Sequence, residues 1–227
     1  MGLFRPIGII DSGSGGLAIA QAIWRILPKQ ATIYLADLAY FPYGNKTPAV
    51  INRRLRRLVA WLIRQRCQLI VIACNTITAA AIDRLRRQFF LPFVGTEPAV
   101  RQGGVVLATP ATVKSRRFRQ LIKKFPVTVL GCPGLAEAIE AGKSIIPLLP
   151  PLPSGTKQII LGCTHYLLVK KQIQAVYGPK INLIDPSEAI ARQTVKLLPQ
   201  LSPGKRQFFT TGRKVIKQDI IFKPCRI

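Results

Sequence analysis

Short apolar runs alternate with longer amphipathic segments along this chain, and this alternation restricts the fold more than any other feature. Each apolar run is bounded by small or turn-forming residues, which is typical of a buried strand, whereas the amphipathic segments place apolar residues at helical spacing. In the first half the pattern predicts strands at 7–10, 33–36 and 69–73, helices at 17–27 and 48–65, and an alanine-rich helix that ends near residue 89.

The same alternation restarts near residue 98. It predicts strands at 105–107, 127–130, 159–161 and 182–184, and helices at 113–124, 135–141, 167–176 and 187–198. Strands that alternate with helices form mostly parallel sheets with helices on both faces. We therefore predict an α/β fold of two similar lobes, with residues 1–97 and 207–227 in an N-terminal lobe and residues 98–206 in a C-terminal lobe.

The chain is strongly basic: 34 Lys and Arg residues against 9 Asp and Glu residues give a formal net charge of +25. Such a charge indicates a polyanionic partner, an anionic substrate or a general property of the surface. The run at 53–57 is one candidate contact for nucleic acid, but its arginines, among them Arg54, lie away from the apolar face of the predicted helix, as on a solvated surface. Aromatic residues do not interleave with the basic runs as RNA-binding sheets require, so we expect only non-specific binding of nucleic acid, at low salt.

The five cysteines do not follow a metal-binding or disulfide pattern. Their number is odd, no CxxC occurs, and a single histidine accompanies them. The first residues lack the apolar core and cleavage site of a signal peptide, and the longest apolar stretches fall far short of the ~20 residues of a membrane span. We therefore expect a cytoplasmic, reducing location, with no metal and no membrane partner.

Chemically reactive residues directly follow several of the predicted strands. Asp11 follows the first strand, Cys74 follows the third, and Cys163 and His165 follow the strand at 159–161. Ligands of open α/β sheets bind beyond the carboxyl ends of the strands. These side chains are therefore the candidate functional site.

Each of these residues also has a purely structural interpretation. Cys74 could be a small buried hydrophobic residue, but its place at a helix N-terminus, where the helix dipole can lower the pKa of a thiol, favours a reactive role. Asp11 could cap the helix that follows it, or it could act as a base or tune the thiol. The other cysteines lack a comparable turn and are assigned to packing: Cys67, Cys132 and Cys225.

Five motifs resemble, in the same order, those of the glutamate racemase family, of which this chain would be a short and unusually basic member. They read IGIIDSGSGGL, FPYGNKT, VIACNTITA, ATPATVKS and ILGCTHYLL, and they span most of residues 5–195. The resemblance implies a two-lobed fold with the active site in the cleft, and racemisation of glutamate by two cysteines without a cofactor. It assigns the α-proton of D-glutamate to Cys74 and that of L-glutamate to Cys163, with Asp11 and His165 as the groups that assist them.

The resemblance also implies which residues hold the substrate. They are Asp11, Ser12, Tyr43, Gly44, Asn75, Thr76, Thr164 and His165, with Thr112 and Glu140 as further candidates. It further implies that the product D-glutamate supplies peptidoglycan synthesis, and it leaves a homodimer as a candidate assembly. The main alternative is a related racemase of aspartate or another amino acid, but the aspartate enzymes typically carry Glu at the position of His165, which favours glutamate.

Overall fold

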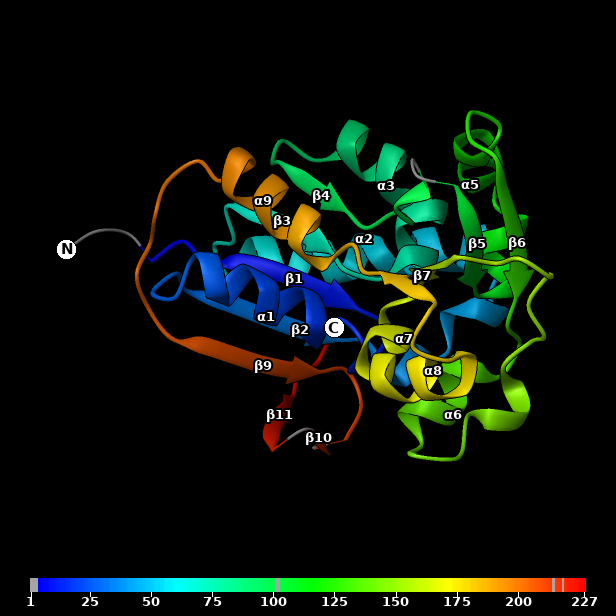
Figure 1. Cartoon of the computed structure of the whole chain (residues 1–227). Helices are drawn as coiled ribbons and strands as arrows, with labels where there is room; N and C mark the ends of the chain where they lie inside the picture. The colour runs from blue at the N-terminus through cyan, green and yellow to red at the C-terminus, as the bar shows by residue number, and fades with distance from the viewer. Residues whose placement is uncertain (1–3, 101–102, 214, 218) are drawn as a thin grey trace.

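Two β-sheets form the framework of the computed structural model, which describes residues 4–100, 103–213, 215–217 and 219–227. The strands of the first sheet are β1 (Ile7–Asp11), β2 (Thr32–Ala36), β3 (Leu69–Ile72), β4 (Phe93–Gly95), β9 (Arg206–Thr210), β10 (Val215–Lys217) and β11 (Ile220–Pro224). They lie in the order β10-β11-β9-β2-β1-β3-β4 (Figure 1). Every neighbouring pair is parallel except β10 and β11.

The second sheet contains four strands, and all of its pairs are parallel. They are β5 (Gly104–Ala108), β6 (Val127–Gly131), β7 (Gln158–Gly162) and β8 (Asn182–Ile184). Their order is β6-β5-β7-β8. The predicted α/β fold with two mostly parallel sheets is therefore confirmed.

Helices cover both faces of each sheet. They are α1 (Leu17–Ile26), α2 (Pro48–Arg64), α3 (Asn75–Gln88), α4 (Pro110–Lys114), α5 (Arg116–Ile122), α6 (Leu135–Glu140), α7 (Thr164–Leu168), α8 (Lys170–Tyr177) and α9 (Ser187–Leu197). On the first sheet, α1 and α9 lie on one face and α2 and α3 on the other (Figure 1). On the second sheet, α6, α7 and α8 pack on one face and α5 on the other.

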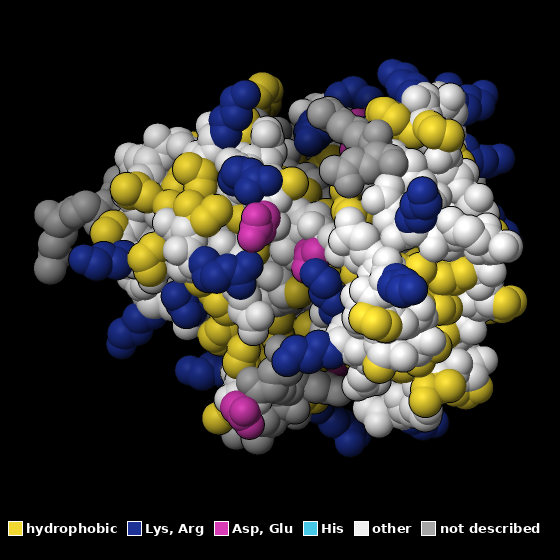
Figure 2. Space-filling model, in the orientation of Figure 1, with side chains coloured by type: hydrophobic (Ala, Val, Ile, Leu, Met, Phe, Trp, Pro, Cys, Tyr) yellow, Lys and Arg dark blue, Asp and Glu magenta, His cyan; other side chains and the backbone are white. Residues whose placement is uncertain are grey.

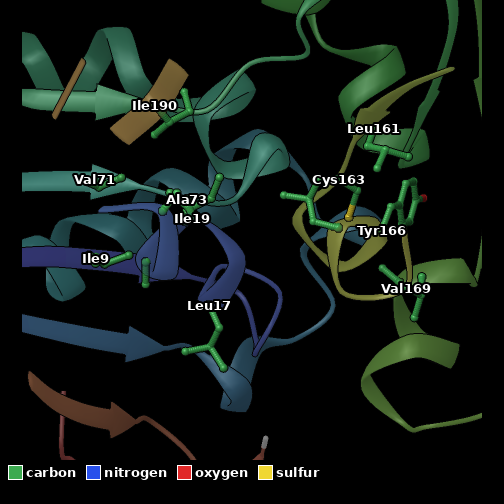
Figure 3. Packing of buried hydrophobic residues seen from close by; sticks show 14 of the residues in the cluster. Ile9, Leu17, Ile19, Val71, Ala73, Leu161, Cys163, Tyr166, Val169 and Ile190 are labelled. Carbon is green, nitrogen blue, oxygen red and sulfur yellow. The ribbon is translucent and has the colours of Figure 1, made fainter. Parts of the chain in front are cut away.

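Alternate residues of β1 pack against the helices on opposite faces of the first sheet. Ile9 belongs to the apolar cluster that contains α1 and α9, whereas Ile10 belongs to the cluster that contains α2 and α3, because successive side chains of a strand point to opposite faces. The first cluster continues into the other lobe through Leu161 and Tyr166 (Figure 3). One hydrophobic core therefore connects the two sheets.

The predicted limits of the two lobes stay predictions. Strands β9, β10 and β11 join the first sheet, and α9, although it follows the second sheet in the chain, packs against α1. Shortly after the predicted boundary between residues 97 and 98, Arg101 and Gln102 lie outside the described residues.

Local capping changes two of the predicted helices. The helix predicted at 113–124 is divided into α4 and α5, because extended Ser115 accepts a hydrogen bond from the N–H of Phe118 and starts a new helix. The helix predicted at 167–176 begins earlier and is divided into α7 and α8 at Val169. Strands β4, β9, β10 and β11 were not predicted: β4 is a three-residue run beside Pro92, and the other three combine short apolar runs with basic or polar residues.

The basic surface agrees with the sequence pattern except at one position. Arg53 and Arg57 of α2 are exposed, but Arg54 is buried and forms an ion pair with Asp37, so it does not belong to the solvated face. Lys and Arg side chains are scattered over the face of the molecule in Figure 2 and do not gather into a stripe. In the described part of the chain, no helix has both the length and the apolar character that crossing a membrane requires.

Candidate active site

A small cavity lies where loops from the two sheets meet. Its volume is about 20 Å³, which is room for about one water molecule. Its wall is formed by Ser12, Phe41, Pro42, Tyr43, Gly44, Asn45, Cys74, Thr76, Thr109, Pro110, Cys132, Gly134, Ala136, Glu137, Cys163 and His165. The cavity thus brings the two strand-end cysteines to one place.

Cys74 follows β3 and is the N-cap residue of α3. Burial raises the pKa of its thiol to about 12, and the nearby charge of Asp11 raises it further, while backbone N–H groups of Ile77 and Thr76 and the hydroxyl of Ser12 partly oppose this. The helix N-terminus therefore acts in the direction expected from the sequence, but desolvation exceeds it. The expected lowering of the thiol pKa is therefore wrong, and with a pKa of about 12 Cys74 is a neutral thiol at neutral pH.

Cys163 follows β7 and is the N-cap residue of α7. Burial raises the pKa of its thiol well above the ordinary value, and a negative charge on Cys74 or Asp11 raises it further. The backbone N–H groups of His165 and Tyr166 oppose this, as the N–H groups of α3 do at Cys74. The two thiols are therefore close enough to affect each other, and they occupy equivalent positions at the ends of strands in opposite sheets.

Asp11 is fully buried but does not cap α1, which begins at Leu17 after Gly16. Its Oδ2 accepts a hydrogen bond of 3.0 Å from the N–H of Gly13, and its Oδ1 accepts one of 3.1 Å from the hydroxyl of Thr164 in the other lobe. Burial raises the pKa of this carboxyl, an effect that the charge of His165 and these hydrogen bonds oppose. The capping interpretation is thus wrong, and Asp11 is placed to act on Cys74.

Glu140 joins the only histidine of the chain to the loop after β1. Its Oε2 lies 2.7 Å from Nε2 of His165 and accepts hydrogen bonds of 2.9 Å from the backbone N–H and the hydroxyl of Ser14. Burial by itself would raise the pKa of Glu140, but the hydrogen bond and charge of His165 and the two Ser14 donors lower it to about 2. Glu140 is therefore a carboxylate that orients His165, and it lies behind the histidine, since it does not line the cavity.

The predicted binding residues separate into two groups. Ser12, Tyr43, Gly44 and Thr76 line the cavity, as do both cysteines and His165. The others support this wall from behind. Thr164 donates to Asp11, Asn75 donates to the carbonyl of Thr96, and the Thr112 hydroxyl lies 3.1 Å from that of Thr76.

Sequence reasoning missed several residues of the wall. Thr109 lies 2.8 Å from the hydroxyl of Thr76, and Asn45 donates a 3.2 Å hydrogen bond to Glu137, so both pairs join the lobes beside the cavity. Cys132, which was assigned to packing, is buried in the core and also lines the cavity. Thr109 and Asn45 do lie within the motifs ATPATVKS and FPYGNKT, but only the pairing of the two lobes gives them partners.

Glycines in the loop after β1 permit the two lobes to approach closely. A Cβ atom on Gly15 would lie 2.6 Å from Nδ1 of His165 and 2.7 Å from the Thr164 hydroxyl. A Cβ atom on Gly13 would lie 2.6 Å from Oε2 of Glu140. All three distances are too short for a real Cβ atom, so the glycines are required where this loop contacts the turn at Cys163.

Comparison with known proteins agrees with this geometry. The family model for Asp/Glu/Hydantoin racemases matches residues 7–194. This chain belongs to that family. Among its relatives, the glutamate racemase of Herpetosiphon aurantiacus is 38% identical over 239 residues, which cover 92% of this chain and 93% of that protein.

Solved structures of racemases share the same fold. The structure of Escherichia coli glutamate racemase in complex with L-glutamate and the activator UDP-MurNAc-Ala gives a TM-score of 0.84 at 30% identity, with 92% of this chain and 90% of that chain covered. Glutamate racemase from Thermus thermophilus in complex with β-chloro-D-alanine gives a TM-score of 0.78 at 31% identity, with 92% and 88% covered. The fold of this racemase-family member is therefore shared along nearly its whole length.

Among the described residues of this racemase-family member, no group of three or more His, Cys, Asp or Glu side chains is arranged to hold a metal ion. The five cysteines are free thiols. The ionisable groups around the cavity are the thiols of Cys74, Cys132 and Cys163, with Tyr43, His165 and Glu137, in its wall, and Asp11 and Glu140 behind it. Proton transfer is the chemistry for which this set of groups is suited.

Proposed function

We propose that this protein is a glutamate racemase that inverts the α-carbon by two-base proton transfer. The observation that carries the proposal is the pair of buried thiols, Cys74 and Cys163, which line one cavity from opposite lobes. An α-carbon held between them presents its hydrogen to one sulfur and its opposite face to the other. Membership of the racemase family and the similarity to glutamate racemases support glutamate as the substrate.

In the proposed reaction, one cysteine is the base and the other is the acid. The thiolate of Cys74 takes the α-proton of D-glutamate, the electron pair of the broken C–H bond moves onto the α-carbon and its carboxylate, and the thiol of Cys163 returns a proton to the opposite face. The product is L-glutamate, and the thiolate now lies on Cys163. The reverse reaction starts from this state, so no cofactor or co-reactant is consumed.

The raised thiol pKa values require that a thiolate be formed inside the site. We assign this step to Asp11 at Cys74 and to His165 at Cys163. Asp11 affects the pKa of Cys74 directly, and its own raised pKa makes it a better proton acceptor than an exposed carboxylate. His165 adjoins Cys163 and is held by Glu140, which stabilises an imidazolium when it forms.

The size of the cavity implies that the lobes separate when substrate binds. Space for about one water molecule does not admit an amino acid with a three-carbon side chain beyond its α-carbon. The contacts of Asn45 with Glu137 and of Thr76 with Thr109 join the lobes beside the cavity. We expect these two contacts to break as glutamate enters and the site to close around the bound substrate.

Incubation with L-glutamate in D₂O tests the proposed function directly. We expect optical rotation to be lost and deuterium to appear at the α-carbon, without added pyridoxal phosphate and in the presence of a chelator, because the thiols exchange their protons with solvent. Inert glutamate beside reactive aspartate would assign the protein to the aspartate alternative. A requirement for pyridoxal phosphate would refute the two-thiol mechanism.

The product of this reaction, D-glutamate, is the form that peptidoglycan synthesis consumes. The homodimer and the cytoplasmic location stay predictions. Sedimentation of the purified protein at several concentrations tests the first, and fractionation of the source cells tests the second.

Nucleic-acid binding is the second candidate function, and we expect it to be weak and non-specific. The scattered positive charges in Figure 2 suit a solvated surface, and their contacts with phosphates are screened by salt. The affinity for duplex DNA should therefore fall about 10³-fold or more between 50 and 200 mM salt, the loss typical of multiple phosphate contacts, with no sequence preference. Titration of labelled duplexes at several salt concentrations measures this, and a tight complex with one preferred sequence at high salt would contradict it.

A further inference from the structure

A buried polar cluster lies beside the proposed active site, at the carboxyl end of β2. Its centre is Asp37, which follows β2 directly and has no exposed surface. The carboxylate accepts hydrogen bonds from the hydroxyl of Tyr43, the guanidinium of Arg54 and the hydroxyl of Thr211. These donors come from a loop, a helix and the segment after β9, so one carboxylate connects three parts of the lobe.

Arg54 is the charged partner in this cluster. Its Nη2 lies 2.7 Å from Oδ1 of Asp37 and its Nε lies 3.0 Å from Oδ2, which is the paired geometry that a planar guanidinium makes with a carboxylate. The same guanidinium stacks 4.4 Å from the ring centroid of Tyr40. Arg54 is 7% exposed, whereas its neighbours Arg53 and Arg57 on α2 are exposed. Arg54 therefore has a different role from the other arginines of this basic run.

The loop that this cluster holds contributes to the catalytic cavity. Two short 3-10 helices, η1 (Leu38–Tyr40) and η2 (Tyr43–Asn45), form the loop, and Tyr43 and Gly44 line the cavity. Asp37 and Arg54 themselves do not line it. The Tyr43 side chain is nearly fully buried, and burial together with the charge of Asp37 raises the pKa of its hydroxyl, which therefore remains a hydrogen-bond donor to Asp37.

The segment after β9 holds the same loop at a second point. The Thr211 hydroxyl donates to Oδ1 of Asp37 at 2.6 Å and accepts from the backbone N–H of Ala39 at 3.2 Å. The backbone N–H of Thr211 also bonds to the carbonyl of Ala36 at the end of β2. The C-terminal strands are thus connected to the loop that lines the cavity.

We propose that Asp37 and Arg54 are positioning residues that set the Tyr43–Gly44 wall of the active site, with Thr211 as their link to the C-terminal strands. This inference rests on the proposed racemase function. Asp37 and Arg54 do not line the cavity and act on it through Tyr43 and Gly44, so they contribute to substrate binding in the ground state and the transition state alike. Their loss therefore raises KM more than it lowers kcat.

Arg54→Lys is the variant that tests this, because it keeps the positive charge and removes the paired hydrogen bonds. We expect KM for glutamate to rise about tenfold or more, by displacement of the wall, while kcat changes less. Arg53→Lys, the adjacent and exposed substitution on α2, is the matched control and should leave both constants unchanged. Thr211→Val removes a single donor and should raise KM in the same direction by a smaller factor, which keeps the test valid if Arg54→Lys does not fold.

Two further measurements separate positioning from general stability. Hydrogen–deuterium exchange should increase in the peptide that contains residues 38–47 and remain unchanged in α3 and α7. Tyr43→Phe removes the hydrogen bond that Tyr43 donates to Asp37. In the double variant with Arg54→Lys, the two effects on kcat/KM should be less than additive. Additive effects, an unchanged KM, or an exchange increase spread evenly over the lobe would each overturn the proposal.

The exchange measurement also distinguishes the two proposals of function and positioning. It does not depend on turnover, so it reports on the loop even if the parent protein does not racemise glutamate. Unchanged exchange at 38–47 in Arg54→Lys would reject the positioning role and leave the racemase function untouched. Absence of deuterium incorporation into glutamate by the parent protein would reject the function and leave the loop result intact.

Discussion

Replacement of either Cys74 or Cys163 by serine is expected to reduce racemisation in both directions by about 10³-fold or more, because each direction needs one base and one acid on opposite faces of the α-carbon. The serine hydroxyl does not provide a populated base near neutral pH. Both thiols line the cavity as N-cap residues of helices, whereas Cys132, the third cysteine of the wall, caps no helix. Initial rates from L- and D-glutamate, measured separately, give the effect.

The two variants should differ with a substrate that carries a leaving group on the β-carbon. Elimination from β-chloroalanine needs only the base that takes the α-proton, after which chloride departs with the C–Cl electron pair. Cys163→Ser should therefore still eliminate from the D enantiomer, and Cys74→Ser from the L enantiomer. Chloride release and pyruvate formation measure this, and loss of elimination from both enantiomers in both variants would contradict the assignment of the two faces.

Controls for this prediction are available in the same chain. Cys225 is partly exposed and does not line the cavity, so Cys225→Ser should retain the parental rate. Cys67 is buried in the core beside α2, and its replacement should act only through stability. If Cys74→Ser racemised at the parental rate, the proposed site would be wrong.

Replacement of Glu140 by glutamine should lower both activity and stability, because it removes a buried charge that accepts from Ser14 and His165. A folded-state pKa of about 2 against the ordinary value of 4.5 corresponds to about 3 kcal/mol of stability at neutral pH. Because this pKa is lowered on folding, the contribution is present above the unfolded pKa and disappears as pH falls from about 5 to about 2. We expect kcat to fall as well, since His165 loses the carboxylate that orients it.

Denaturant unfolding at pH 7 and at about pH 3 measures the stability effect. The parent should be more stable than Glu140→Gln at pH 7, and the difference should shrink at the lower pH. Glu188→Gln is a matched control, because Glu188 is exposed on α9 and its ion pair with Arg192 is a surface contact of little energy. An equal difference between parent and Glu140→Gln at both pH values would show that the charge of Glu140 is not responsible.

Local sequence patterns were sufficient for the architecture and for the centre of the proposed site. Apolar runs of three to five residues predicted seven of the eleven strands in the described part of the chain, and Cys74 and Cys163 follow two of these strands at their carboxyl ends. Such patterns work because strand and helix periods are properties of short segments, and because parallel sheets collect the ends of their strands along one edge. The start of α5 could also have been predicted, because serine is a preferred N-cap residue. Its side chain accepts a hydrogen bond from the N–H three residues later, as Ser115 does from Phe118.

The partners of these residues depended on contacts between distant parts of the chain. Glu140 reaches Ser14 across 126 positions, and Thr211 reaches Asp37 across 174, and no period or motif links such pairs. Arg54 shows the consequence most clearly. Its place in a run of arginines predicted a solvent-exposed side chain, whereas in the folded lobe Arg54 is buried against the carboxylate of Asp37.

The sequence by itself therefore determined which elements form and which reactive groups stand at the ends of their strands. Only the tertiary structure decided the chemical state of those groups. The helix N-terminus at Cys74 is a local feature and lowers the thiol pKa, but the second lobe and the loops remove water from the same sulfur and raise its pKa to about 12. Desolvation depends on everything packed around a group, so it is a property of the folded molecule and not of any segment of the chain.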